Sequence, residues 1–88
     1  MFWKNNFKRK IKKFEKEKKY WDLLVYCNDL LQKNPKNVYG IRGKIFALKK
    51  QGKIKQSQEF CEQVMEMFPY DPDVVSCIAE VKKEYETW

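Results

Sequence analysis

The chain carries KEKKYWDLLVYCNDLLQKNPKN at residues 16–37 and, 34 residues later, KQGKIKQSQEFCEQVMEMFPYD at residues 50–71. The two segments align without a gap. Four aligned pairs are identical: Lys16/Lys50, Lys19/Lys53, Cys27/Cys61 and Pro35/Pro69. Because a fixed period of this length is the signature of a repeat architecture, we interpret the chain as two copies of one structural unit.

Each unit contains two apolar patterns with the spacing of an amphipathic helix. The second helices of the two units are predicted from Tyr20, Leu23, Leu24, Cys27, Leu30 and Leu31, and from Ile54, Ser57, Cys61, Val64 and Met65. Pro35 and Pro69 end these helices. The first helices are predicted from Trp3, Phe7, Ile11 and Phe14, and from Ile41, Ile45 and Leu48. Gly52 follows the latter, as a left-handed helix terminus prefers.

A fifth helix is predicted over about residues 72–87. Asp71 is a good N-cap and Pro72 suits the first turn, as Asn37 suits the start of the helix at residue 38. One side of the fifth helix is apolar: Val74, Val75, Ile78, Val81 and Tyr85. No segment requires a β-strand. The sequence therefore predicts an all-α fold of five helices.

The 34-residue helix-turn-helix period resembles the tetratricopeptide repeat (TPR) family. Residues 50–54, Lys-Gln-Gly-Lys-Ile, are similar to the turn between its paired helices, and Pro69 falls at its closing proline. The resemblance implies a right-handed TPR-like helical-hairpin solenoid of five antiparallel helices. It divides the single domain, residues 1–88, into repeats at 4–37 and 38–71 and a capping helix at 72–88.

The chain departs from the family pattern where paired helices approach each other. The family's small residues are replaced by larger or polar ones at Ile11, Ile45, Leu23 and Ser57, and its turn glycine by Lys18. We therefore expect splayed helix pairs or a degenerate first repeat.

Charge is unevenly distributed along the 88 residues, whose net charge is +7. Residues 1–55 carry 17 Lys/Arg and 4 Asp/Glu, a net charge of +13, whereas residues 56–88 carry 2 and 8, a net charge of −6. This gradient favours an oriented acidic partner over a featureless polyanion. No apolar run is long enough to cross a bilayer, so a cytoplasmic protein is expected.

The residue inventory argues against catalysis. The chain has no histidine, no phosphate-binding glycine loop and no nucleophile motif. Its three cysteines are odd in number and widely spaced, so neither a disulfide framework nor a metal site is expected. We predict a non-enzymatic protein without a cofactor, whose thiols are buried in a reducing compartment.

Helical geometry predicts a binding stripe beside the core stripe of the third helix. Its residues are Tyr39, Arg42, Phe46 and Lys49, with Lys8 and Lys12 one period earlier. In TPR-like proteins the first helices line a concave groove that receives a peptide. The stripe fits an acidic peptide or protein: Arg42 is assigned the carboxylate contact and Phe46 the apolar anchor. The alternative, in which the stripe has no binding role, is that Phe46 packs on a neighbouring helix and the lysines are solvated.

Two other functions stay open from the sequence. The basic N-terminal half fits nucleic-acid phosphates, and a basic start with an acidic end favours head-to-tail homo-oligomers by repeat stacking. Residues 1–19 have three interpretations: the first repeat helix, a basic amphipathic helix on an anionic membrane, or a phosphate-binding segment.

Overall fold

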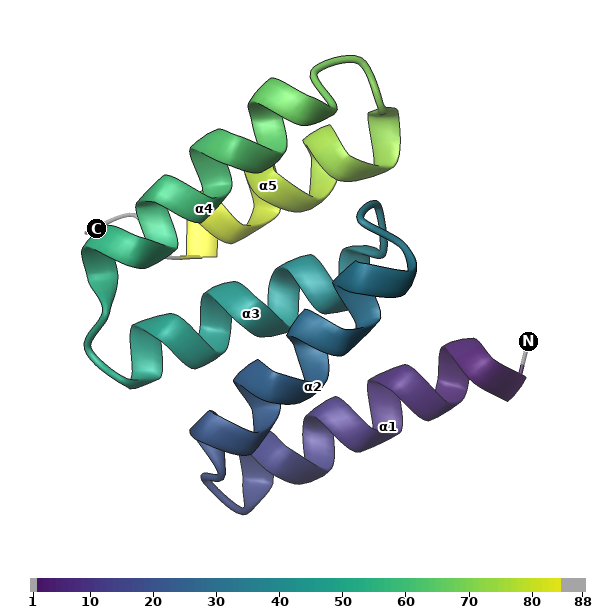
Figure 1. The fold of residues 1–88 in the computed structure, drawn as a ribbon, viewed down its shortest axis with the longest axis vertical. Helices are drawn as coiled ribbons and strands as arrows, with labels where there is room; N and C mark the ends of the chain where they lie inside the picture. Colours follow the sequence, from purple (N-terminus) through teal and green to yellow (C-terminus); the bar gives the residue numbers. More distant parts are fainter. Residues whose placement is uncertain (1, 85–88) are drawn as a thin grey trace.

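The structure is a computed structural model that describes the backbone of residues 2–84 and the side chains of residues 6–84. Five helices follow one another, as Figure 1 shows: α1 (Phe2–Lys16), α2 (Tyr20–Lys33), α3 (Val38–Lys50), α4 (Ile54–Met67) and α5 (Pro72–Glu84). The described residues contain no strand, which confirms the predicted all-α fold. Tyr85 and the side chain of Trp3, both predicted on apolar stripes, lie outside the described residues.

None of the helices within residues 2–84 has the length and apolar character that crossing a membrane requires.

The turns that join α1 to α2 and α3 to α4 repeat the same backbone geometry 34 residues apart. The N–H groups of Lys19 and Lys53 each donate to the carbonyl five residues earlier, at 2.9 and 2.8 Å. The residue before each is left-handed, with φ of 58° at Lys18 and 78° at Gly52. Lys18 therefore adopts the conformation that glycine provides in the second turn, although a side chain makes this conformation costly.

Helix α3 lies at the centre of the fold and, within residues 2–84, is the one helix that contacts all four others. Two buried clusters both include residues of it. One joins α3 to α4 and α5 through Ile41, Ile45, Cys61, Val64, Val74, Cys77, Ile78 and Val81. The other joins α3 to α1 and α2 through Ile11, Leu23, Leu24, Cys27, Leu30, Ala47 and Leu48. The predicted core positions on α2 and α3 are thus confirmed as buried or half-buried.

The apolar face of α1 packs into the second of these clusters. Ile11 is buried, and Phe7 and Phe14 are half-buried against the same cluster. The structure shows residues 2–16 as a helix docked on α2 and α3, which agrees with the docking that the first of the three interpretations requires.

Close packing of α2 on α3 depends on two glycines that the sequence analysis did not single out. A Cβ atom on Gly43 would lie 2.4 Å from the Cys27 Sγ, and one on Gly40 would lie 3.1 Å from Leu31. Both distances are below ordinary van der Waals contact, and Cys27 is fully buried. The small residues that let α2 and α3 approach are therefore on α3, at positions other than those expected from the family pattern.

Candidate functional site

A cleft of about 840 Å³ lies along the first half of α3. It is bordered by α1, by the end of α2 with the following loop, and by α5 as far as Glu80. Its lining residues are Phe7, Leu30, Lys33, Asn34, Lys36, Asn37, Val38, Tyr39, Arg42, Asp71, Asp73, Cys77 and Glu80.

Two side-chain caps fix the helices that flank this cleft. The Asn37 side chain accepts hydrogen bonds from the N–H groups of Tyr39 and Gly40, at 3.0 and 3.3 Å. Asp71 caps α5 in the same way, and the hydrogen bond from the Val74 N–H, followed by the charge of Lys36, lowers the pKa of Asp71. Both predicted N-caps are thus confirmed, and both lie in the cleft lining.

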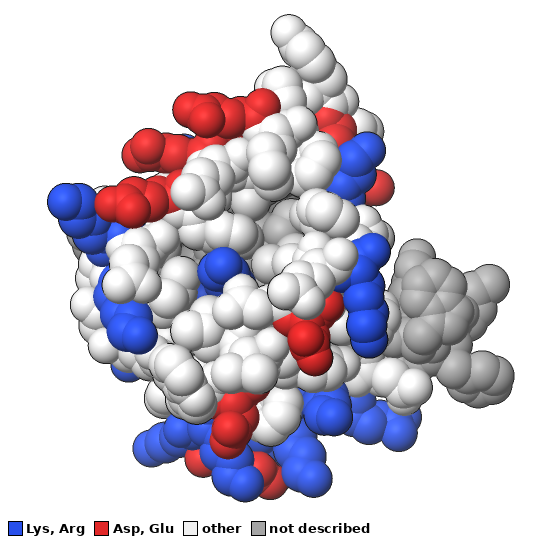
Figure 2. All heavy atoms as spheres, in the orientation of Figure 1, with Lys and Arg blue, Asp and Glu red and all other residues white. Residues whose placement is uncertain are grey.

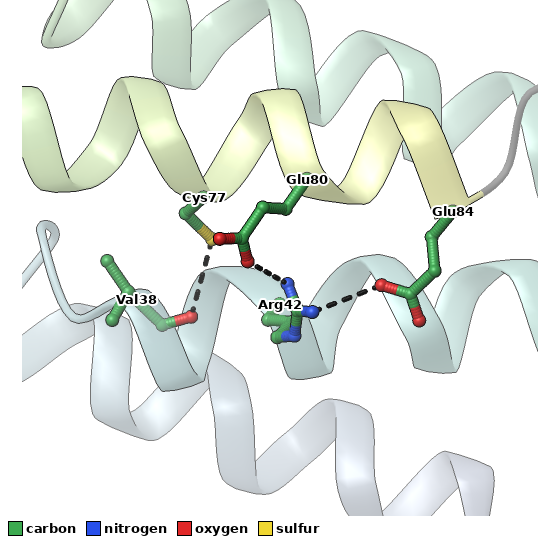
Figure 3. Close-up of polar contacts among 5 residues, drawn as sticks. All are labelled: Val38, Arg42, Cys77, Glu80 and Glu84. Carbon is green, nitrogen blue, oxygen red and sulfur yellow. Dashed lines mark hydrogen bonds and ion pairs between the residues drawn. The ribbon is translucent and has the colours of Figure 1, made fainter.

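Arg42 spans the gap between α3 and α5. Its Nη1 lies 3.5 Å from the Glu80 Oε2 and its Nη2 lies 3.1 Å from the Glu84 Oε2. Figure 3 shows the guanidinium between the two glutamates, beside a Cys77 thiol that donates to the Val38 carbonyl at 3.8 Å. The residue assigned to a partner's carboxylate is therefore paired with two carboxylates of its own chain.

A third carboxylate acts on Arg42 from α1. Burial raises the pKa of Glu15, while the positive charges of Lys12 and Arg42 oppose this shift and Glu84 adds to it. The surroundings of Arg42 are therefore acidic as well as basic. The cleft lining has the same balance, with three basic residues, Lys33, Lys36 and Arg42, and three acidic ones, Asp71, Asp73 and Glu80.

The structure brings two of the six predicted groove residues, Tyr39 and Arg42, into the cleft lining. Phe46 is half-buried, with its ring centroid 6.0 Å from that of Tyr20 and 5.5 Å from the Lys50 ammonium. It packs on the start of α2, in agreement with the alternative prediction that Phe46 packs on a neighbouring helix.

The three predicted lysines lie outside the cleft lining. Lys8 and Lys12 are exposed on α1, and Lys49 is half-buried near the end of α3.

Most of the cleft lining was not predicted from the sequence, because the loop between α2 and α3 carries no apolar pattern and was interpreted as a connection only. Lys36 in that loop pairs with Asp71 at 3.5 Å and lies 5.5 Å from the ring centroid of Phe68. Phe7, assigned to the core, also reaches the cleft, with its ring centroid 6.4 Å from that of Tyr39. The two caps, Asn37 and Asp71, were the available signal, since both mark helix starts at this end.

A second, shallower hollow of about 450 Å³ lies on the outer side of α1 and α2. Its lining residues are Asn6, Arg9, Lys10, Lys13 and Tyr26. The Lys10 ammonium lies 5.1 Å from the Tyr26 ring centroid, a cation–π distance. All the charged lining residues are basic, in contrast to the balanced cleft.

The three cysteines are free and buried. Burial raises the pKa of the Cys27 thiol to about 12 and that of the Cys61 thiol to about 11, so both stay protonated near neutral pH. Within the described part of the chain, no three His, Cys, Asp or Glu side chains gather in a way that would hold a metal ion.

Comparison with protein-family models, with curated proteins and with solved structures finds no match for this chain.

Proposed function

We propose that the chain is a TPR-like helical-repeat module without enzymatic activity, which binds an acidic segment of a partner protein in the cleft beside α3. The observation that carries the proposal is the cleft of about 840 Å³, whose lining includes Phe7, Val38 and Tyr39 together with Arg42. Apolar area beside an arginine is the combination from which peptide-binding sites gain most of their affinity.

The repeat part of the proposal is supported by the equivalent turns at Lys18 and Gly52 and by the order of helix contacts. Helices α1 and α5 each contact α3, and α2 and α4 pack on α3 as well. A solenoid would arrange its first helices in such a row, with the binding surface along them.

Arg42 would exchange its own carboxylates for those of a partner. The side chains of Arg42, Glu80 and Glu84 are 45%, 68% and 54% exposed, so both ion pairs are solvated and contribute about 0–1 kcal/mol each. A partner's carboxylate that also brings an apolar side chain into the cleft would replace them at little cost. Tyr39 and Phe7 supply the apolar contact in this proposal, because Phe46 lies outside the cleft.

The test uses two labelled peptides that differ only in charge: one has a leucine flanked by glutamates, and the other has glutamine at each glutamate. Fluorescence anisotropy should show binding of the acidic peptide alone. Arg42→Glu should weaken its binding about tenfold or more, whereas Lys55→Glu, an equal charge change at an exposed position on α4, should change it little. Equal affinity of both peptides, or equal effects of both substitutions, would contradict the proposal.

A second variant removes the carboxylates of the chain that compete with the peptide for Arg42. In Glu80→Gln/Glu84→Gln, Arg42 keeps its place on α3 but loses both ionised partners, so the affinity for the acidic peptide should rise. An unchanged or lower affinity would show that Arg42 links α3 to α5 and does not bind the peptide.

The proposal also puts the module in the cytoplasm, where a reducing environment keeps the three buried thiols free.

A further inference from the structure

Three acidic residues form a row on the outward face of α4. Glu59, Glu62 and Glu66 are exposed and follow one another at steps of three and four residues, so they share one helix face. Within residues 6–84, none of them forms an ion pair. We refer to them below as the acidic row.

Three basic residues form a matching row on the outward face of α1. Arg9, Lys13 and Lys16 are exposed, at steps of four and three residues. Arg9 and Lys13 also line the second hollow, whose charged residues are all basic. No ion pair joins these three to any side chain that the structure describes. We refer to them as the basic row.

The two rows are mirror images in spacing. Each covers seven residue steps, about 10.5 Å at a rise of 1.5 Å per residue. If α4 and α1 lie antiparallel, the steps coincide and every position is matched: Glu59 faces Lys16, Glu62 faces Lys13 and Glu66 faces Arg9. A parallel alignment matches every position as well, since Glu59 then faces Arg9, Glu62 faces the exposed Lys12 and Glu66 faces Lys16, so the spacing allows both directions.

The two rows of a single molecule do not meet. Helices α1 and α4 make no contact with each other and lie at opposite edges of the fold in Figure 1. In Figure 2, acidic side chains gather over α4 at one edge and basic side chains along the edge formed by α1. The surface that complements each row in sign and spacing is therefore the other row on a second molecule.

We propose that copies of this chain associate head to tail, with the acidic row of α4 docked on the basic row of α1 of the next copy. The two surfaces differ, so the contact is heterologous and closes into a ring or continues as a filament. Exposed ion pairs are individually weak and screened by salt, so association should be strong in about 0.01 M salt and largely lost in about 0.15 M. Over that range the Debye length falls from about 30 Å to about 8 Å.

Sedimentation equilibrium of the full chain tests the proposal with variants matched in charge. Glu62→Gln/Glu66→Gln removes two members of the acidic row, and Asp22→Asn/Asp29→Asn makes the same change of charge at exposed positions of α2. We expect the first variant to associate about tenfold more weakly than the second at low salt, with circular dichroism showing both folded. Equal association by the two variants would overturn the proposal.

Charge reversal gives a second, independent test. Glu59→Lys/Glu62→Lys/Glu66→Lys and Arg9→Glu/Lys13→Glu/Lys16→Glu should each be monomeric alone, because both rows of each variant then carry the same sign. An equimolar mixture should associate again. A mixture that stays monomeric would refute the pairing of the two rows.

Nucleic acid is the competing occupant of the basic row. If the wild type stayed monomeric at low salt but bound a labelled oligouridylate that the Arg9→Glu/Lys13→Glu/Lys16→Glu variant did not bind, the row would be a phosphate site and the proposal wrong. The peptide-binding cleft is not involved in these outcomes, so the two proposals stand or fall separately.

Discussion

Replacement of Lys18 by glycine should stabilise the protein, although it removes a side chain. With φ of 58°, Lys18 has a left-handed conformation that costs a residue with a Cβ atom about 1–2 kcal/mol. Glycine avoids this cost but loses about 0.5–1 kcal/mol more in backbone entropy on folding. The Lys18 side chain forms no hydrogen bond or ion pair with another described residue, so nothing else is lost. A net gain of about 0.5–1 kcal/mol follows.

The matched control lies 34 residues further along the chain. Gly52 has φ of 78°, and no atom lies within 4 Å of the place where its Cβ would be. Gly52→Ala therefore measures the left-handed cost of a Cβ atom less the gain in backbone entropy, with no steric clash, and should destabilise the protein by about 1 kcal/mol. The same backbone geometry thus predicts effects of opposite sign at two equivalent positions.

Reversible thermal unfolding followed by circular dichroism is a sufficient assay. In a domain of this size 1 kcal/mol corresponds to about 4–8 °C, so Lys18→Gly should raise the Tm by about 2–8 °C and Gly52→Ala should lower it by a similar amount. Urea titration with an unchanged slope would show that the native state, and not the compactness of the unfolded chain, is affected. A lower Tm for Lys18→Gly would refute the equivalence of the two turns.

Three further substitutions test the core and a cap. Gly43→Ala should destabilise the protein by about 1–3 kcal/mol, because the new methyl group overpacks on the Cys27 thiol. In a Cys27→Ala background the same change should cost less stability. Additive effects in this double-mutant cycle would disprove the contact. Ser57→Ala should stabilise by about 1 kcal/mol in chemical denaturation, because the buried Ser57 hydroxyl has no hydrogen-bond partner in the described structure; a loss of stability would reveal a partner. The folded-state pKa of Asp71 is lowered, so its ionisation stabilises the fold above the ordinary aspartate pKa of 3.8 and this contribution disappears as the pH falls through the lowered value. Asp71→Asn should therefore lose less stability than the wild type between pH 4 and pH 2 in thermal unfolding, and parallel profiles would contradict the assignment.

The helices and the core were predictable because they depend on local chemistry. Apolar residues repeat at helical spacing, Pro35 and Pro69 cannot continue a helix, and Asn37 and Asp71 cap the helices that follow. Each of these signals acts within a few residues. The structure accordingly confirms five helices and the predicted apolar faces on α2 and α3.

Contacts between distant helices were not predictable in the same way. Periodicity placed Arg42 beside the core stripe of α3, but it does not say what lies across from it. Glu80 is 38 residues away and Glu84 is 42 residues away. Likewise, the pairing of Gly43 with Cys27 requires knowledge of how α2 crosses α3. One sequence shows which face of a helix is apolar, whereas the partner of each side chain depends on the crossing geometry.

The central position of α3 has a consequence for how the protein unfolds. Neither α1 nor α2 packs closely on α4 or α5, and both buried clusters include residues of this one helix. Loss of either cluster leaves α3 with an exposed apolar face and weakens the support of the other. Whereas long repeat arrays lose cooperativity and unravel from their ends, residues 2–84 should therefore melt in a single transition, and the two helix pairs should have no independent stability when separated.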